Sequence, residues 1–309
     1  MVIDKIRKEN DCCMETIGLI GCGEMGSGIA YSLKNKGYEV MVYDYINNKN
    51  VDLLMKNNIK FVDMQKLTQN CKIIIMCLSD AKAVEDVCFG EYGLLNMLST
   101  KSILIDTTTS HPKTTQKINK CLKNKKIKFA DAPLTRSPIE AMQGRLNSLV
   151  GADDETYKEI EPVLKAFCEN IIRVGEVGSG HEIKLLNNFI CMSFTAIVEF
   201  GLLCGKELDI DIKTLDKVMS MGSNYVSSIP SMLDYIENKN QDVLKFSLKN
   251  ATKDMRYFFE MIEDNESKKW FEPIYNLYRD ATEDNKNKDK NLPALYEYLK
   301  DNENNKKEG

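Results

Sequence analysis

Residues Ile17-Gly18-Leu19-Ile20-Gly21-Cys22-Gly23-Glu24-Met25-Gly26 read as an apolar strand, a glycine-rich turn and the start of a helix. In the Gly-x-Gly-x-x-Gly turn, Gly21 allows a tight bend, Gly23 lacks the Cβ that would block a pyrophosphate, and Gly26 lets the helix lie close to the strand. The start of the helix adds free N–H groups and a partial positive charge. We therefore expect a dinucleotide to bind at Gly21, Cys22, Gly23, Glu24, Met25 and Gly26.

A second strand-like run, residues 39–43, is followed by Asp44, which lies 18 residues beyond Gly26. A carboxylate at this place accepts hydrogen bonds from both ribose hydroxyls and repels a 2′-phosphate. Asp44 therefore favours NAD over NADP as the cofactor. Lys49 lies near enough along the chain to keep NADP open, although a solvated surface lysine is the alternative role for it.

Short apolar runs alternate with helical patterns through the first half of the chain, which predicts a doubly wound, mostly parallel sheet with helices on both faces. The expected strands are 16–20, 39–43, 72–78, 102–106, 128–131, 148–151 and 171–174. The expected helices are 25–35, 81–87, 112–122 and 154–168. This alternation predicts an α/β Rossmann domain over residues 16–176.

The second half of the chain has helical patterns alone, which predicts an all-α domain over residues 177–300, joined by one long helix over 182–207. Apolar residues recur along that helix at Ile183, Leu186, Ile190, Phe194, Ile197 and Leu203. Such a helix packs on more than one neighbour, and a subunit interface is one way to do so. Further helices are expected at 213–219, 242–262, 269–281 and 292–299. The polar ends, 1–15 and 301–309, are predicted to be disordered.

The composition excludes several functional classes. Lys+Arg 42 against Asp+Glu 46 gives a net charge of −4, without the basic footprint of a nucleic-acid-binding protein. No apolar run, the longest being 73–78, approaches the roughly 18 residues of a membrane span. The 10 Cys are scattered and follow no secretory signal, which indicates reduced thiols in the cytoplasm. With only His111 and His181, no metal site is expected.

Three further stretches complete a pattern with the glycine loop. Asp131-Ala132-Pro133-Leu134-Thr135-Arg136-Ser137 stands at a strand end, Gly178-Ser179-Gly180-His181-Glu182-Ile183-Lys184-Leu185-Leu186-Asn187-Asn188 opens the long helix, and Lys253-Asp254-Met255 lies in a later helix. In this order the four motifs resemble the β-hydroxyacid dehydrogenase family, which includes 3-hydroxyisobutyrate dehydrogenases and sulfolactaldehyde reductases. The resemblance covers residues 16 to 296 and implies a C-terminal domain like that of 6-phosphogluconate dehydrogenase, and a homodimer or homotetramer.

The resemblance also implies roles for single residues. Lys184 corresponds to the family's catalytic lysine, and Asn188 to the asparagine one helical turn later. Lys253 corresponds to a lysine that contacts the cofactor, although a solvated helix lysine is the alternative. The implied wall of the cofactor site comprises Leu78, in the turn Cys77-Leu78-Ser79, and the pair Thr108 and Thr109.

One motif departs from the family pattern. The family has Ser-Gly-Gly where this chain has Thr135, Arg136 and Ser137, and Glu140 stands where a glycine is common. The guanidinium of Arg136 presents a planar fork that suits a carboxylate, sulfonate or phosphate. We therefore expect residues 135–137 to hold the anionic end of a substrate, while a surface salt bridge is the alternative role for Arg136. Asn187 is either a second substrate contact or a core residue.

The residue types of the lysine motif suit proton transfer. Lys184 and Asn188 are four residues apart and share one face of a helix. The positive end of the helix dipole and burial both disfavour an ammonium, so both lower the pKa of a lysine there. Such a lysine can protonate the oxygen of a carbonyl that accepts a hydride. The sequence thus predicts an NAD(P)-dependent oxidoreductase of a small hydroxyacid or acid semialdehyde. The alternatives are an imine reductase or a catalytically silent NAD-binding scaffold.

Overall fold

The computed structural model describes residues 15–44, 51–223, 225–284, 286, 287 and 289–308, with side chains as far as residue 303. The chain forms two compact units, Met1–Lys184 and Leu185–Gly309. This division falls inside the long helix, whereas the sequence predicts that the second domain begins at residue 177. Of the predicted N-terminal extension, residues 1–15, all but Glu15 lie outside the described residues.

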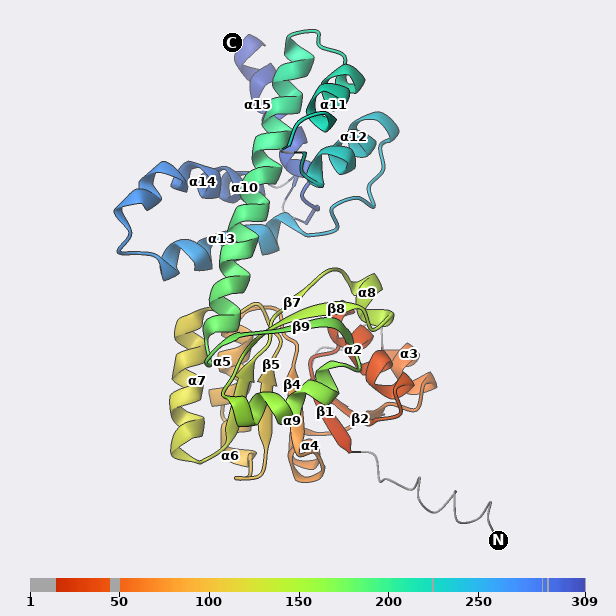
Figure 1. Ribbon diagram of the computed structural model, residues 1–309, viewed down its shortest axis with the longest axis vertical. Helices are drawn as coiled ribbons and strands as arrows, with labels where there is room; N and C mark the ends of the chain where they lie inside the picture. The colour runs from red at the N-terminus through yellow and green to blue at the C-terminus, as the bar shows by residue number, and fades with distance from the viewer. Residues whose placement is uncertain (1–14, 45–50, 224, 285, 288, 309) are drawn as a thin grey trace. The chain divides into compact units, whose positions relative to one another are not determined.

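The first unit is built on one sheet (Figure 1). Its strands follow the order β3-β2-β1-β4-β5-β6-β8-β7, and β9 pairs with β8. All pairs from β3 to β6 are parallel, whereas β8 runs antiparallel to β6 and β7. The strands are β1 (Thr16–Ile20), β2 (Glu39–Tyr43), β3 (Lys60–Phe61), β4 (Ile73–Met76), β5 (Ile103–Asp106), β6 (Lys128–Asp131), β7 (Leu134–Thr135), β8 (Leu146–Gly151) and β9 (Cys168–Gly175). This arrangement confirms the predicted mostly parallel, doubly wound fold.

Helices cover both faces of this sheet, and each face has its own apolar core. Alternate residues of one strand face opposite sides, so Ile73 and Ile75 pack in the first core and Ile74 and Met76 in the second. Helices α2, α3, α8 and α9 contribute to the first core, and α4 to α7 to the second. The helices are α2 (Glu24–Asn35), α3 (Val51–Lys56), α4 (Met64–Asn70), α5 (Ala81–Phe89), α6 (Leu94–Met97), α7 (Pro112–Asn124), α8 (Pro138–Met142) and α9 (Asp154–Leu164).

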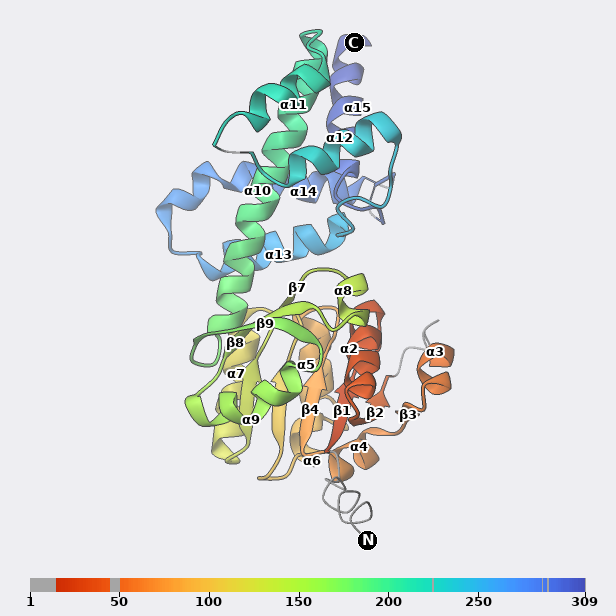
Figure 2. The ribbon, with the colours of Figure 1, turned by 45° about the vertical axis from the view of Figure 1, so that its right-hand side comes forward.

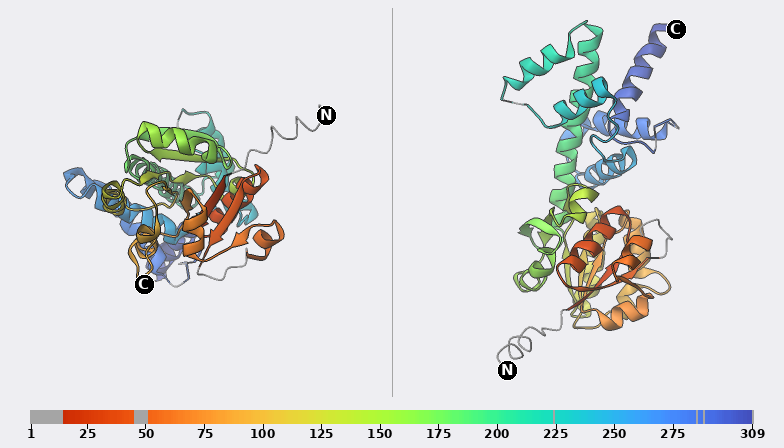
Figure 3. Two further views of the ribbon diagram at one scale, coloured as in Figure 1. Left: turned by 90° about the horizontal axis from the view of Figure 1, so that it is seen from below. Right: turned by 90° about the vertical axis from the view of Figure 1, so that its right-hand side faces the viewer.

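The second unit consists of helices gathered around α10 (Figures 2 and 3). Phe189 of α10 stacks on Phe258 of α13 with ring centroids 4.3 Å apart. Further along α10, Val198, Leu202 and Leu203 form a core with α11, α12 and α15. The elements are α10 (Ser179–Glu207), α11 (Ile212–Ser220), α12 (Ser228–Asn238), α13 (Leu248–Met261), η1 (Glu266–Trp270), α14 (Glu272–Glu283) and α15 (Ala294–Glu308). In the described part of this unit no strand is present, as predicted.

One side of α10 remains exposed in the single chain. Of the apolar residues predicted to pack, only Leu203 is buried, whereas the others are between 40% and 60% exposed: Ile183, Leu186, Ile190, Phe194 and Ile197. Phe200 extends this exposed apolar face. The helix is also long and apolar enough to cross a membrane by length and composition alone, with half of its most apolar window buried in the chain. The expectation from the sequence counted unbroken apolar runs, and Ser193, Thr195 and Glu199 interrupt the apolar residues of this helix.

Several predicted boundaries were wrong for local reasons. The helix predicted over 154–168 ends at Leu164, because Cys168 already pairs with Leu146 in the sheet. The helix predicted over 242–262 begins at Leu248, where the Ser247 side chain accepts a hydrogen bond from Asn250 N and caps it. The predicted disordered tail is helical as far as Glu308, where it continues the helix that begins at Ala294.

Candidate active site

The motif residues of the first unit meet at one edge of the sheet. Backbone pairing places the last residues of adjacent parallel strands side by side, with Ile20 opposite Met76, Met76 opposite Asp106, and Asp106 opposite Asp131. The glycine loop, the Cys77–Ser79 turn, Thr107–Thr109 and Ala132 each follow one of these ends. In open parallel sheets, ligands bind outside the carboxyl ends where the strand order reverses, which here is between β1 and β4.

Each glycine of the loop meets a different surrounding. Gly21 has a φ of +92°, and a Cβ on it would lie 2.4 Å from the Cys77 carbonyl oxygen. A Cβ on Gly26 would lie 2.1 Å from the Gly21 carbonyl oxygen, whereas a Cβ on Gly23 would meet open space. The first and third glycines are therefore required by the fold itself, and the second leaves room for a ligand.

The start of α2 suits the pyrophosphate and ribose of a dinucleotide. Gly23 is the N-cap, and within the described residues no side chain caps this helix, so the start of α2 offers the positive end of the helix dipole. At the end of β2, Asp44 Oδ2 accepts hydrogen bonds from Cys22 N at 2.8 Å and Cys22 Sγ at 3.0 Å. The carboxylate thus lies beside the loop, where the ribose of an NAD-type dinucleotide fits.

The opposite wall of this edge is held together by threonines. Thr108 Oγ1 accepts a hydrogen bond from Leu78 N at 3.0 Å, which joins the loops after β4 and β5. Thr108 N donates to Asp106 Oδ1 at 3.0 Å. Burial raises the pKa of Asp106, and its Oδ2 has no hydrogen-bond partner among the described residues. Leu78 and Thr108 are thus brought together, with Thr109 half-buried beside Thr108.

Asp131 anchors the start of α10 on the sheet. Its buried carboxylate accepts hydrogen bonds from Gly178 N at 2.6 Å and from His181 N at 2.8 Å. A Cβ on Gly151 would lie 2.5 Å from Asp131 Oδ1, and one on Gly180 would lie 2.8 Å from Asp131 Oδ2. The glycines of two separated motifs therefore make room for one buried carboxylate, a connection that sequence reasoning missed.

The two histidines have different environments. His111 is the N-cap of α7, and its Nδ1 accepts a hydrogen bond from Lys113 N at 3.0 Å. His181 is fully buried, and its ring lies 2.6 Å from Thr115 Oγ1 and 2.8 Å from the Thr108 carbonyl oxygen. A buried histidine at the helix start is not visible in the sequence pattern, because its partners lie more than sixty residues away.

Lys184 follows one turn into α10 and is 8% exposed. Asn188, the next residue on the same helix face, donates from Nδ2 to Asp254 Oδ2 at 2.7 Å. Lys253 Nζ lies 3.3 Å from the other oxygen of Asp254. The Lys253-Asp254-Met255 motif therefore supplies a buried carboxylate that fixes Asn188, a role not assigned to Asp254 from the sequence. Asn187 is exposed and lies at the long distance of 3.4 Å from Asn188 Oδ1.

The loop of residues 135–137, which departs from the family motif, has a backbone conformation typical of glycine. Arg136 has a φ of +77°, a conformation that favours glycine. Its guanidinium pairs with Glu169 on β9 and donates to the Arg145 carbonyl oxygen. Thr135 Oγ1 accepts from Asn147 Nδ2 at 2.9 Å. The structure therefore places Arg136 in the salt bridge that the sequence left open as its alternative role.

The Glu140 carboxylate accepts hydrogen bonds from both the backbone N–H and the hydroxyl of Ser137. Its Oε2 accepts a hydrogen bond from Ser137 N at 3.0 Å and one from the Ser137 hydroxyl, which completes a capping box on α8. These bonds hold the pKa of Glu140 below its usual value. A substrate anion at this loop therefore has to compete with two internal carboxylates, Glu140 and Glu169.

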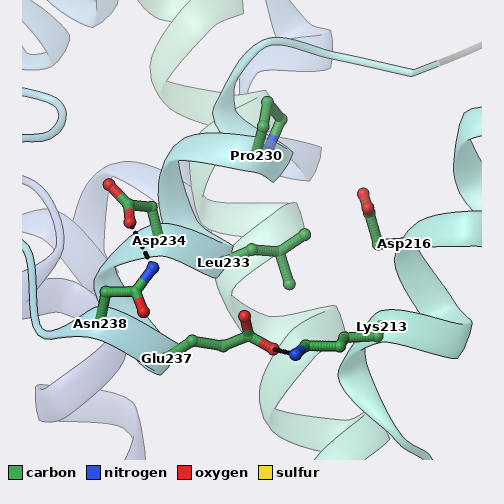
Figure 4. A pocket seen from close by; sticks show the side chains of 7 residues that line it. All are labelled: Lys213, Asp216, Pro230, Leu233, Asp234, Glu237 and Asn238. Carbon is green, nitrogen blue, oxygen red and sulfur yellow. Dashed lines mark hydrogen bonds and ion pairs between the residues drawn. The ribbon is translucent and has the colours of Figure 1, made fainter.

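A separate pocket of about 350 Å³ lies between α11 and α12 (Figure 4). Lys213 lies 3.8 Å from Glu237 across it, and Asp234 accepts a hydrogen bond from Asn238 at 2.7 Å. The remaining lining residues are Asp216, Pro230 and Leu233. Asp216 accepts a hydrogen bond from Tyr225, which does not line the pocket, and the pocket contains none of the residues predicted from the motifs.

Comparison with known proteins identifies the family. Residues 16–175 match the NAD binding domain of 6-phosphogluconate dehydrogenase. The chain is 31% identical over 208 residues to 3-sulfolactaldehyde reductase of Escherichia coli, covering 67% of this chain and 70% of that protein. The chain belongs to the β-hydroxyacid dehydrogenase family. The first unit of this chain is thus an NAD-binding domain, as the glycine loop predicted.

Solved structures show the same fold over nearly the whole length of this family member. Mycobacterium tuberculosis 3-hydroxyisobutyrate dehydrogenase, solved with L-serine, has a TM-score of 0.82 at 17% identity and covers 93% of this chain and 99% of its own. An imine reductase variant from Myxococcus stipitatus in complex with NAD+ has a TM-score of 0.59 at 17% identity, covering 92% and 99%. As a member of the β-hydroxyacid dehydrogenases, the protein is an NAD(P)-dependent oxidoreductase.

Proposed function

We propose that this protein transfers a hydride between a nicotinamide cofactor and a small hydroxyacid or acid semialdehyde, with Lys184 as the general acid and base. The observation that carries the proposal is the place of Lys184. Lys184 is buried about one turn into α10. At the start of this helix, the N–H groups of Gly178 and His181 donate to Asp131, which lies at the same sheet edge as the glycine loop. The named relatives reduce or oxidise substrates of this class.

The residues divide the work as follows. The cofactor, when bound, supplies or accepts the hydride. Lys184 donates a proton to the oxygen of the substrate carbonyl as it becomes an alkoxide, and recovers the proton in reverse. One amide hydrogen of Asn188 is committed to Asp254. Asn188 Oδ1 accepts only a long hydrogen bond, from Asn187 Nδ2 at 3.4 Å, and its second lone pair can accept from an ammonium group, a donor without acceptor capacity. We assign to Asn188 the orientation of Lys184.

Residues at the sheet edge hold the cofactor in this proposal. The uncapped start of α2 and the open space at Gly23 receive the pyrophosphate. Asp44 accepts the ribose hydroxyls and disfavours the 2′-phosphate of NADP. Leu78, Thr108 and Thr109 form the wall of the nicotinamide half, and Lys253 is assigned the cofactor contact that its motif implies.

The anionic end of the substrate is assigned to the loop of Thr135, Arg136 and Ser137, with Asn187 as a second contact. The pair between Arg136 and Glu169 is partly exposed, at 34% and 50% for the two side chains. A pair of this kind contributes only about 0–1 kcal/mol, so a substrate carboxylate or sulfonate can replace Glu169 at little cost.

The exposed surface and the cysteines support proposals about the oligomeric state and the cellular compartment. The exposed apolar face of α10 suits a second copy of the chain, in a homodimer or homotetramer. The eight described cysteines are free thiols, in agreement with a reduced cytoplasm. The net charge of −4 argues against nucleic acid as a partner.

The test is oxidation of NADH and NADPH with a panel of small aldehydes: succinic, tartronate and methylmalonate semialdehydes and sulfolactaldehyde. We expect fast turnover of one acid aldehyde with NADH. Lys184→Ala should lower kcat by roughly 10²- to 10⁴-fold, while the control Lys165→Ala, at an exposed lysine paired with Glu161, keeps it. Turnover retained by Lys184→Ala contradicts the assignment. NADH binding without any turnover favours the silent scaffold, and turnover of cyclic imines alone favours an imine reductase.

A further inference from the structure

The buried ring of His181 joins three separate parts of the first unit. Nε2 lies 2.8 Å from the carbonyl oxygen of Thr108, and Nδ1 lies 2.6 Å from Oγ1 of Thr115 on α7. A carbonyl oxygen only accepts, so Nε2 carries the proton and donates. In the neutral ring Nδ1 is then the acceptor, and the Thr115 hydroxyl donates to it. The backbone N–H of His181 donates to Asp131 on β6.

Thr108 is fixed from all its polar sides by this arrangement. Its hydroxyl accepts from Leu78 N, its N–H donates to Asp106, and its carbonyl oxygen accepts from His181. The first two bonds belong to the loops after β4 and β5. Only the third comes from α10, three residues before Lys184 on the same helix. His181 is therefore a direct link between the threonine wall of the sheet edge and the helix turn that leads to Lys184.

We propose that His181 is a positioning residue: its Nε2–H holds the Thr108–Thr109 wall in register with Lys184. The proposal rests on the proposed function for the role of Lys184 and of this wall. Two carboxylates lie near the ring, since Asp131 Oδ2 lies 3.8 Å from Nδ1 and His181 is close enough to act electrostatically on the Asp106 carboxyl. Asp131 already accepts from two backbone N–H groups and Asp106 Oδ1 from Thr108 N, while Nε2 lies within hydrogen-bond distance of the Thr108 carbonyl oxygen.

Two substitutions separate the two hydrogen bonds of the ring. His181→Gln places an amide N–H near the position of Nε2 and keeps the donor to Thr108. His181→Leu removes both bonds and leaves the Thr108 carbonyl oxygen buried without a partner. Thr115→Val is the matched control, because it removes the hydroxyl that donates to Nδ1 and leaves the bond to Thr108 intact.

The first measurement is the Kd of NADH by fluorescence titration, which requires no substrate. We expect His181→Leu to raise this Kd by roughly 5- to 100-fold, as expected for a buried acceptor left unpaired. His181→Gln should remain within about three-fold of the wild type, within the usual variation of one hydrogen bond. Thr115→Val should lower the melting temperature without changing the Kd.

The second measurement is kcat at saturating NADH, which should fall in His181→Leu and recover in His181→Gln. Equal Kd and kcat effects of Thr115→Val and His181→Leu overturn the proposal, because they indicate a general loss of stability. If His181→Leu does not fold, His181→Asn replaces it, since its shorter amide reaches Thr115 but not Thr108. An unchanged Kd in that variant overturns the proposal as well. The NADH titration stands whether or not Lys184 proves to be the proton donor.

Discussion

At the scale of single residues, the glycines of the first loop separate folding from binding. A Cβ on Gly26 would lie 2.1 Å from the Gly21 carbonyl oxygen, whereas a Cβ on Gly23 would meet open space. We therefore expect Gly23→Ala to fold with unchanged stability and to raise the Kd of NADH by roughly ten-fold, the equivalent of about 1.4 kcal/mol. Gly26→Ala should lower the free energy of unfolding by about 1–3 kcal/mol.

Urea unfolding and NADH titration of both variants check this expectation. A Gly23→Ala protein that unfolds as easily as Gly26→Ala indicates that the loop has no room for a side chain. Unchanged NADH affinity of Gly23→Ala indicates that the pyrophosphate does not approach this residue.

The substrate loop offers a test at Arg136. Because Glu169 competes for its guanidinium, Glu169→Gln should lower the KM of an anionic aldehyde by roughly 2- to 5-fold, the worth of an exposed ion pair. Arg136→Ala should raise it by roughly 10- to 100-fold, as for the loss of a charged hydrogen bond. Steady-state kinetics at saturating NADH measure both. Glu155→Gln is the control, since this glutamate is also exposed and paired, but with Lys128. A KM that does not respond to Arg136→Ala places the substrate anion elsewhere.

The sequence predicts the residues with a local signal and misses those with a distant partner. Gly21, Gly23, Gly26 and Asp44 follow from spacing along one strand–turn–helix unit, and they lie together in the structure. Asp131, His181 and Asp254 each act through partners 47 to 73 residues away in the chain. No periodicity encodes such a pairing, and only the fold brings the partners into contact. The sequence offers a salt bridge as an alternative role for Arg136, but it does not identify the partner, Glu169, which lies 33 residues further along the chain.

At the scale of elements, most of the longer strands and helices were predicted, whereas the 11-residue helix α12 and the shortest elements were not. Strands β1, β2 and β6 have the expected bounds, because their apolar runs are flanked by turn residues. Two-residue strands such as β3 and β7, and short helices such as α6 and α8, carry too few residues for a pattern to repeat. Their pairing with neighbours, rather than their own sequence, decides their conformation.

Helix α10 contains a buried acid that makes the stability depend on pH. Glu199 is fully buried, and neither carboxylate oxygen has a hydrogen-bond partner in the described chain. Burial raises the pKa of Glu199 well above its usual value, and the nearby Tyr235 and Tyr278 also have a raised pKa. Above the ordinary glutamate pKa of about 4.3 the unfolded chain has lost a proton that the folded chain keeps, so the free energy of unfolding falls as pH rises.

Glu199→Gln removes this titration. We expect the variant to be more stable than the wild type at pH 7. Between the pKa of Glu199 in the unfolded chain and its pKa in the folded chain, the free energy of unfolding of the wild type should fall by up to about 1.4 kcal/mol per pH unit more than that of the variant. Urea denaturation from pH 4 to pH 8 measures the slope. The control Glu207→Gln, at an exposed glutamate of the same helix, should keep the wild-type slope. Parallel curves for wild type and Glu199→Gln contradict the assignment of a neutral buried carboxyl.

At the scale of the whole molecule, we expect the exposed apolar face of α10 to bind a partner. Ile197 is 60% exposed and Phe200 is 54% exposed, and an apolar patch of this kind marks an interaction surface. We expect light scattering after gel filtration to give at least a dimer for the wild type. Ile197→Glu should shift it to monomer, while Lys206→Glu, at an exposed residue of the same helix, leaves the assembly intact. A monomeric wild type that co-sediments with lipid vesicles assigns this face to a membrane instead.

The carboxylate of Asp131 also bears on the order in which the chain assembles. The amides that it binds, Gly178 N and His181 N, come 47 and 50 residues later in the sequence. During synthesis β6 therefore leaves the ribosome before α10 begins. Because the first turn is the costly step of helix formation, α10 starts on an acceptor that the sheet has already provided. The start of the helix that contains Lys184 is thus fixed by Asp131, in a segment that is synthesised before any helix of the second unit.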